Sequence, residues 1–142
     1  MIYFDNAATT FPKPQAVLKN VINGIKIYGG NAGRSGHQLS LRTSQKIYEV
    51  RSKLGDFFHV SPEQVIFTAN CTQALNMAIK GVMLDGGHII LSNLEHNSVI
   101  RPIHALAEKR IIEYDVAKVY EGDTERTLRS FASYLRRDTR AI

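Results

Sequence analysis

A segment near the middle of the chain, residues 65–81, places the strongest constraint on the fold. It opens with the apolar triplet Val65, Ile66 and Phe67, a pattern typical of a short buried strand. After a short break, apolar side chains recur at helical spacing, at Ala74, Leu75, Ala78, Ile79 and Val82. We therefore expect a strand that leads within a few residues into a helix, with Thr72 as the helix N-cap.

The junction between this strand and this helix is suited to hold one phosphate group. The first turn of a helix presents free N–H groups and the positive end of its dipole, and ligands of open α/β sheets lie at the carboxyl ends of the strands. The groups available to the anion are the hydroxyls of Thr68 and Thr72, the amide of Asn70 and the backbone N–H groups of Cys71 and Thr72. The Walker pattern GxxxxGKS/T and the dinucleotide fingerprint GxGxxG are absent. A capped helix that binds no ligand is the alternative.

The composition is that of one globular domain. The chain has 142 residues, of which 44% are apolar and 22% charged, enough to build a single core. We expect no membrane span, because no run of about 18 uncharged apolar residues exists, and no signal peptide. Cys71 is the only cysteine, which excludes a disulfide within the chain and favours a cytoplasmic location.

The net charge of +5 is spread unevenly along the chain. Residues 1–60 carry eight Lys and Arg against three Asp and Glu, an excess that would suit an anionic ligand or nucleic acid. However, Lys19, Lys26, Lys46 and Lys53 fall at surface positions of helical patterns and have no aromatic residues between them. We therefore favour solvated helix faces and expect no nucleic-acid partner.

Helices and strands alternate along most of the chain. The patterns predict helices near residues 14–27, 40–58, 72–84, 102–109 and 124–135, strands near 65–67, 88–92 and 111–114, and the start of another strand at 140–142. On the first helix we expect an inward face made of Val17, Leu18, Val21, Ile22 and Ile25. This alternation predicts an α/β fold with a mainly parallel sheet flanked by helices.

We expect two parts within this fold. Residues 1–37 form an N-terminal segment with a helix and a Gly-rich loop, and residues 38–142 form an incomplete α/β unit. A sequence that stops as a new strand begins favours a fragment of a longer domain.

Four short motifs follow one another in the sequence. They are YFDNAATT at residues 3–10, NAGRSGH at 31–37, FTANCTQALN at 67–76 and EHNS at 95–98. In order and spacing they resemble the N-terminal portion of the class V aminotransferase family, in particular cysteine desulfurase-like enzymes. The resemblance implies the large domain of a fold type I enzyme that depends on pyridoxal 5'-phosphate (PLP).

The resemblance also implies roles for individual residues. Cys71 and Thr72 would bind the cofactor phosphate, and His96 would stack on the pyridine ring and act as the catalytic residue, because an imidazole there can transfer protons. Asn76 would support the cofactor site from one helical turn further on. Without the resemblance, His96 reads as a structural residue, and Asn76 as one that makes only a local hydrogen bond.

Four residues near the N-terminus would lie on the substrate side of this site. They are Ala7, Ala8, Arg34 and His37, of which the last two belong to a loop with four glycines in ten residues. The alternative for residues 28–37 is a flexible surface loop. Cys71 does not correspond to the persulfide-forming cysteine of the family, and we expect no metal site.

By resemblance, several catalytic groups would lie beyond residue 142, among them the Schiff-base lysine. Of the lysines present, Lys80 comes nearest in sequence to the phosphate site, but we expect it to face away. The implied parent reaction removes sulfur from L-cysteine and gives alanine and an enzyme persulfide, in a homodimer, and we expect this chain alone to be inactive. The alternatives are another class V aminotransferase, a selenocysteine lyase, or a non-catalytic phosphate-ligand-binding or assembly module.

Overall fold

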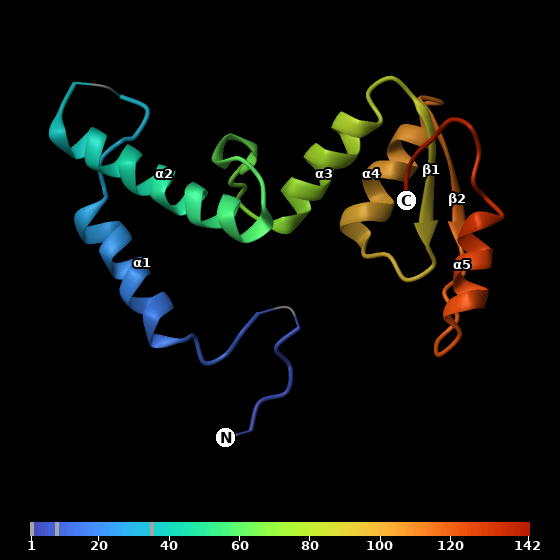
Figure 1. Cartoon of the computed structure of the whole chain (residues 1–142), viewed down its shortest axis with the longest axis horizontal. Helices are drawn as coiled ribbons and strands as arrows, with labels where there is room; N and C mark the ends of the chain where they lie inside the picture. The colour runs from blue at the N-terminus through green and yellow to red at the C-terminus, as the bar shows by residue number, and fades with distance from the viewer. Residues whose placement is uncertain (1, 8, 35) are drawn as a thin grey trace. The chain divides into compact units, whose positions relative to one another are not determined.

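The computed structural model describes residues 2–7, 9–34 and 36–142 (Figure 1). The chain divides into two compact units, Met1–Ile66 and Phe67–Ile142, which are described separately below. The division that the sequence suggests, between residues 37 and 38, falls inside the first unit and stays a prediction.

The first unit is helical. It contains α1 (Gln15–Ile27), α2 (Gln38–Phe58) and the short 3₁₀ helix η1 (Pro62–Gln64). The α2 helix ends at His59, whose left-handed conformation (φ 56°) allows its N–H to bond back to the carbonyls of Gly55 and Asp56. These helices agree with the sequence pattern.

The apolar face predicted on α1 is not buried, so that prediction is wrong. Leu18 is 42% exposed and Ile25 75%, and the other members of the stripe lie between these values. The periodicity identified the amphipathic face correctly, but a periodic stripe does not say what covers it. Within the first unit, no described element covers it.

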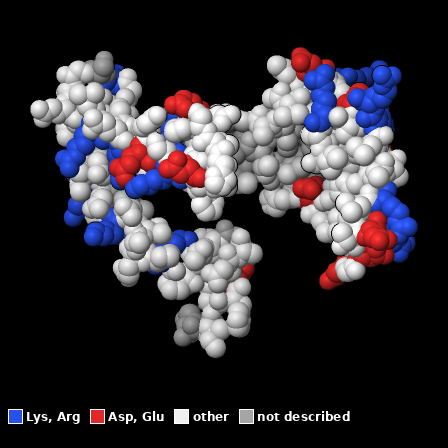
Figure 2. Space-filling view, viewed as in Figure 1, with Lys and Arg blue, Asp and Glu red and all other residues white. Residues whose placement is uncertain are grey.

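Acidic and basic side chains alternate along α2, and Figure 2 shows the two signs side by side there. Lys46 and Lys53 both bond to Glu49, at N–O distances of 2.9 and 2.7 Å. The hydrogen bond from Lys53, and then that from Lys46, lowers the pKa of Glu49 to about 2. Both lysines are therefore part of a solvated helix face.

The second unit is a three-layered α/β arrangement around a parallel sheet (Figure 1). Its elements are α3 (Cys71–Val82), β1 (Gly87–Ser92), α4 (Asn97–Glu108), β2 (Ile112–Ala117), α5 (Thr124–Ala132) and β3 (Thr139–Ala141). The strand order is β2-β1-β3, and both pairings are parallel. The predicted parallel α/β fold is confirmed, and so is the strand start near residue 140.

The core lies between β1 and the helices α3 and α4. Ile89 and Leu91 alternate along β1 and pack with Met83, Ile103 and Ile112, all at most 5% exposed. Burying each of these side chains stabilises the fold by about 1.5–3 kcal/mol. β1 is buried along residues 88–91 because it is the central strand and a parallel sheet is covered on both faces.

The strand predicted at residues 65–67 is absent, and this is a correction. The structure has no strand at residues 65–67, and Ile66 is 66% and Phe67 48% exposed. A strand exists only through hydrogen bonds to a neighbour, and local sequence does not reveal whether a neighbour is present.

The α4 helix begins at Asn97, so the prediction that Pro102 lies in its first turn is wrong. His96 caps the helix by accepting a hydrogen bond from the Ser98 N–H, and this sets the earlier start. Pro102 lies in the helix interior, where it lacks the N–H for one backbone bond, while its ring is buried. α5 likewise ends at Ala132 rather than near residue 135.

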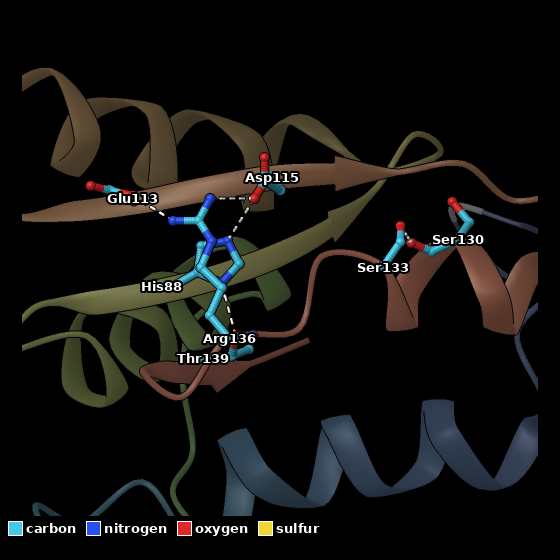
Figure 3. A network of polar contacts seen from close by, with 7 residues as sticks. All are labelled: His88, Glu113, Asp115, Ser130, Ser133, Arg136 and Thr139. Carbon is cyan, nitrogen blue, oxygen red and sulfur yellow. Dashed lines mark hydrogen bonds and ion pairs between the residues drawn. The ribbon is translucent and has the colours of Figure 1, made fainter.

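A polar network joins the three strands near their amino-terminal ends (Figure 3). The fully buried ring of His88 places Nδ1 2.9 Å from Thr139 Oγ1 and Nε2 3.1 Å from Asp115 Oδ2. Arg136 donates to Asp115 at 2.6 Å and to Glu113 at 2.5 Å. These bonds, first to Glu113 and then to Asp115, raise the pKa of Arg136. Both ring nitrogens of His88 are thus satisfied, as burial requires.

Candidate phosphate site and the groove between α3 and α4

The start of α3 is fixed by Asn70 and not by Thr72, which corrects the predicted N-cap. The Asn70 side chain accepts a hydrogen bond from Gln73 N at 2.9 Å, and the Gln73 side chain accepts one from Ala69 N at 2.8 Å. The two bonds hold the first turn of α3 from both sides, although the Gln73 side chain bonds to the residue before the N-cap and not to the N-cap itself. Asn is among the best N-cap residues, and Thr72 becomes the second residue of the helix.

The capping leaves two backbone donors free at the helix start. Within the described part of the chain, the N–H groups of Cys71 and Thr72 have no hydrogen-bond acceptor. The predicted side-chain donors are partly engaged, because Thr68 Oγ1 donates to the Asn70 carbonyl at 3.0 Å and the Asn70 oxygen caps the helix. The candidate anion site therefore consists of two N–H groups and the exposed Thr72 hydroxyl.

A groove of about 560 Å³ runs from this site between α3 and α4. From α3 it is lined by Thr72, Asn76 and Lys80, and from the α4 side by His96, Asn97, Ser98, Arg101, Pro102, Ala105, Leu106 and Lys109. The residues of α3 are spaced by four, which puts them on one helix face. The structure thus brings Thr72, Asn76 and His96 together, whereas the exposed Cys71 side chain does not line the groove.

His96 is held by the helix that it caps. Its Nδ1 accepts a hydrogen bond from Ser98 N at 3.1 Å and lies 2.9 Å from Ser98 Oγ. Because Nδ1 is an acceptor, the proton of the neutral ring is on Nε2. The ring is exposed, so a ligand in the groove meets a fixed ring whose Nε2 carries the proton.

Asn76 and Lys80 extend the α3 side of the groove. Asn76 Nδ2 donates to the Thr72 carbonyl at 3.0 Å, so this side chain makes a local hydrogen bond and also lines the groove. Lys80, which was expected to face away from the phosphate site, lines the same groove two helical turns beyond Thr72. Side chains on a helix lean toward its N-terminus, which brings Lys80 toward Asn76.

The residues predicted on the substrate side belong to the first unit. Ala7 is exposed, and Ala8 lies outside the described residues. His37 caps α2, its Nδ1 accepting a hydrogen bond from Ser40 N at 3.2 Å. The guanidinium of Arg34 forms no ion pair with a described residue.

The Gly-rich loop before α2 is anchored by hydroxyl groups. Ser40 Oγ lies 2.8 Å from the Asn31 carbonyl and also contacts that of Arg34, and Ser44 Oγ donates to the Ala32 carbonyl at 3.0 Å. Thr43 similarly bonds to the Tyr28 carbonyl. This explains why Ser40 and Thr43 are buried. Described residues of this loop are thus hydrogen-bonded to α2.

Comparison with known proteins assigns the chain to a family. The model of the aminotransferase class-V family matches residues 2–142. The chain belongs to this family. A probable cysteine desulfurase of Methanothermobacter thermautotrophicus is 34% identical over 122 residues, which cover 85% of this chain and 30% of that protein. The predicted class V resemblance is therefore confirmed.

Two solved structures share the fold. The apo cysteine desulfurase of Thermococcus onnurineus NA1 matches with a TM-score of 0.76 and 30% identity, over 87% of this chain and 32% of that one. A NifS-like protein matches with a TM-score of 0.84 over 97% of this chain and 38% of that one, and its 24% identity supports the fold alone. The chain thus spans between 30% and 38% of the length of these class V relatives.

Sequence reasoning missed the basic residues of the groove. Arg101 and Lys109 lie on the same face of α4, eight residues apart, and Lys80 lies across from them on α3. The spacing of Arg101, Ala105 and Lys109 by four residues was a visible signal, but the helix was expected to begin too late for Arg101 to belong to it.

No described helix is long and apolar enough to cross a membrane. Among the described residues, no three His, Cys, Asp or Glu side chains lie close enough together to hold a metal ion.

Proposed function

We propose that this chain supplies the phosphate-binding part of a PLP-dependent cysteine desulfurase. The observation that carries the proposal is that Thr72 and His96, 24 residues apart, line one groove beside the free N–H groups of α3. Membership of the class V family and the similarity to cysteine desulfurases support this choice of cofactor and reaction. L-cysteine is the proposed substrate of the full-length protein, and a homodimer its proposed assembly.

The residues present fit a phosphate dianion. Two N–H groups at the positive end of α3 and the Thr72 hydroxyl supply donors. No Asp or Glu is among the described residues that line the groove. An anion there gains charge-assisted hydrogen bonds without a nearby carboxylate to repel it.

Each residue of this chain then has a stated task. Cys71 contributes its backbone N–H, Thr72 its N–H and hydroxyl, and Asn76 holds the Thr72 carbonyl. His96 covers the bound ring and exchanges a proton through Nε2, since Nδ1 is committed to the helix cap. The cofactor, when bound, supplies the electron sink of the reaction. Ala7, Ala8, Arg34 and His37 are proposed to lie on the substrate side.

Two alternatives use the same phosphate site. One is a class V enzyme that acts on a different substrate, such as an aminotransferase or a selenocysteine lyase. The other is a module that binds a phosphate ligand without turnover. We propose that this chain alone is inactive. Experiments on residues 1–142 therefore have to be compared with the second alternative, binding of a phosphate ligand without turnover.

Ligand binding with and without the phosphate tests the proposal. We expect the chain to bind PLP more tightly than pyridoxal, measured by calorimetry. Thr72→Val removes one charge-assisted hydrogen bond and should weaken PLP binding by about tenfold or more. Cys71→Ala is the matched control, because it keeps the backbone N–H and should retain affinity.

Two results would contradict the proposal. One is equal affinity for PLP and pyridoxal, and the other is an unchanged affinity in the Thr72→Val variant. An assay for alanine released from L-cysteine addresses turnover separately. We expect none from this chain, and alanine formation above the rate with free PLP would refute the inactivity proposed for it.

A further inference from the structure

Three basic side chains gather in the half of the groove away from the phosphate site. Lys80 of α3 and Arg101 and Lys109 of α4 are all exposed and line the same groove. Within the described part of the chain, none of the three has a carboxylate within ion-pair distance. An anionic group placed between them would therefore not compete with a described carboxylate of this chain for these charges.

This lack of partners distinguishes the three residues from basic residues elsewhere. Lys46 and Lys53 pair with Glu49, and Arg136 pairs with Glu113 and Asp115. Glu108 of α4 is next to Lys109 in the sequence but does not line the groove, and its carboxylate lies 3.5 Å from His104 Nε2. The groove thus combines concavity with unbalanced positive charge.

The floor of the same half is apolar. Pro102, Ala105 and Leu106 lie between the basic positions, with Pro102 buried and Leu106 partly buried. A ligand that fits must present carboxylates to the rim and an aliphatic group to the floor. Arg101 and Lys109 are eight residues apart, which is about 12 Å along a helix. An extended peptide covers that distance with about four residues.

We propose that this half of the groove docks an acidic peptide segment of a partner protein. The segment carries two or three Asp or Glu side chains that contact Lys80, Arg101 and Lys109, and an aliphatic side chain that contacts Leu106. Nucleic acid fits less well, because the lining holds no Phe, Tyr or Trp among the described residues on which a base could stack. The proposal does not depend on the cofactor, whose phosphate site lies at the other end.

Fluorescence polarisation with a labelled peptide tests the docking surface. The probe is the hexapeptide Glu-Leu-Glu-Glu-Leu-Glu, and its control has Gln in place of every Glu. We expect the acidic probe to bind at least tenfold more tightly than the Gln peptide. The affinity should fall as salt rises from 50 to about 500 mM, because exposed charges are screened.

A pair of triple variants separates the groove from the overall charge. The groove variant combines Lys80→Gln, Arg101→Gln and Lys109→Gln, and we expect its affinity to fall about tenfold or more. The control variant combines Lys19→Gln, Lys26→Gln and Arg137→Gln, three exposed residues outside the groove. It loses the same charge and should keep its affinity within about twofold. Circular dichroism checks that both variants are folded.

A charge exchange protects the test against a folding defect. The variant that combines Lys80→Glu, Arg101→Glu and Lys109→Glu should bind a peptide with Lys in place of Glu and should lose affinity for the acidic one. Saturating PLP should leave the affinity for the acidic peptide unchanged, which separates this proposal from the proposed cofactor function. Equal losses in both triple variants, or tighter binding of single-stranded DNA than of the acidic peptide, would overturn the proposal.

Discussion

The carboxylate of Asp115 lies 3.1 Å from Nε2 of His88, a ring without solvent exposure. Asp115 also accepts a hydrogen bond from Arg136, so one carboxylate serves two basic groups from different elements. Because His88 is the second residue of β1 and Arg136 precedes β3, this contact ties the central strand to both of its neighbours.

Removal of this carboxylate should destabilise the sheet. Asp115→Ala leaves the buried Nε2 of His88 without a partner, and we expect it to lower the free energy of unfolding by about 1–3 kcal/mol. Glu113→Ala is the matched control, since Glu113 is exposed and contacts only Arg136 within this network. Its cost should be at most about 1 kcal/mol. Urea unfolding followed by circular dichroism measures both, and equal costs would contradict the structural role of Asp115.

The Asn70 cap should matter more than the Asn76 side chain one turn later. Asn70→Ala removes the acceptor for Gln73 N, and we expect a loss of about 1 kcal/mol in stability. Asn76→Ala should lower the stability by less, because it removes only a side-chain bond to the carbonyl of Thr72, a residue that already lies within the helix. Thermal melting of the two variants compares them. A larger effect at Asn76 would show that the groove, and not the cap, stabilises this end of α3.

The ion pairs of Glu49 give α2 a defined acid response. Hydrogen bonds from Lys53 and Lys46 lower the pKa of Glu49 from 4.5 to about 2. A depressed carboxyl pKa contributes stability that is present above 4.5 and is lost as the pH falls towards 2. Glu49→Gln should therefore melt slightly earlier than the parent chain at pH 7 and alike at pH 2. The effect is small because the groups are exposed, and a difference that grows on acidification would contradict this assignment.

The exposed stripe of α1 should tolerate polar substitution in this chain. Ile25 is 75% exposed, so Ile25→Gln should change the free energy of unfolding by no more than about 0.5 kcal/mol. Ile103 is fully buried in the core, and Ile103→Ala should cost about 2–5 kcal/mol. Chemical denaturation of both variants tests the contrast. A cost at Ile25 close to that at Ile103 would mean that the stripe is covered in solution.

The sequence was informative where structure follows from local pattern. Short apolar runs predicted β1 and β2, the chemistry of a helix start predicted an anion site at Thr72, and the family resemblance added His96 to that site. The prediction of a strand at residues 65–67 was wrong because strand formation depends on a neighbouring strand that is distant in the sequence. The predicted start of α4 was wrong because the capping role of His96 was not considered.

Other features depend on contacts that no local pattern contains. The hydroxyl of Ser40 reaches carbonyls six and nine residues away, and that of Thr43 reaches Tyr28, so the anchoring of the Gly-rich loop was not predictable. The position of Lys80 depends on how α3 and α4 pack. These contacts depend on tertiary packing, which cannot be inferred from composition or from the periodicity of apolar residues.

Two histidines, His37 in the first unit and His96 in the second, share one constraint. His96 and His37 each accept a backbone N–H at Nδ1 and thereby begin a helix. On each ring the cap occupies Nδ1 and leaves Nε2 for other contacts. A group that needs Nδ1 of either ring would have to displace the backbone N–H which that ring caps.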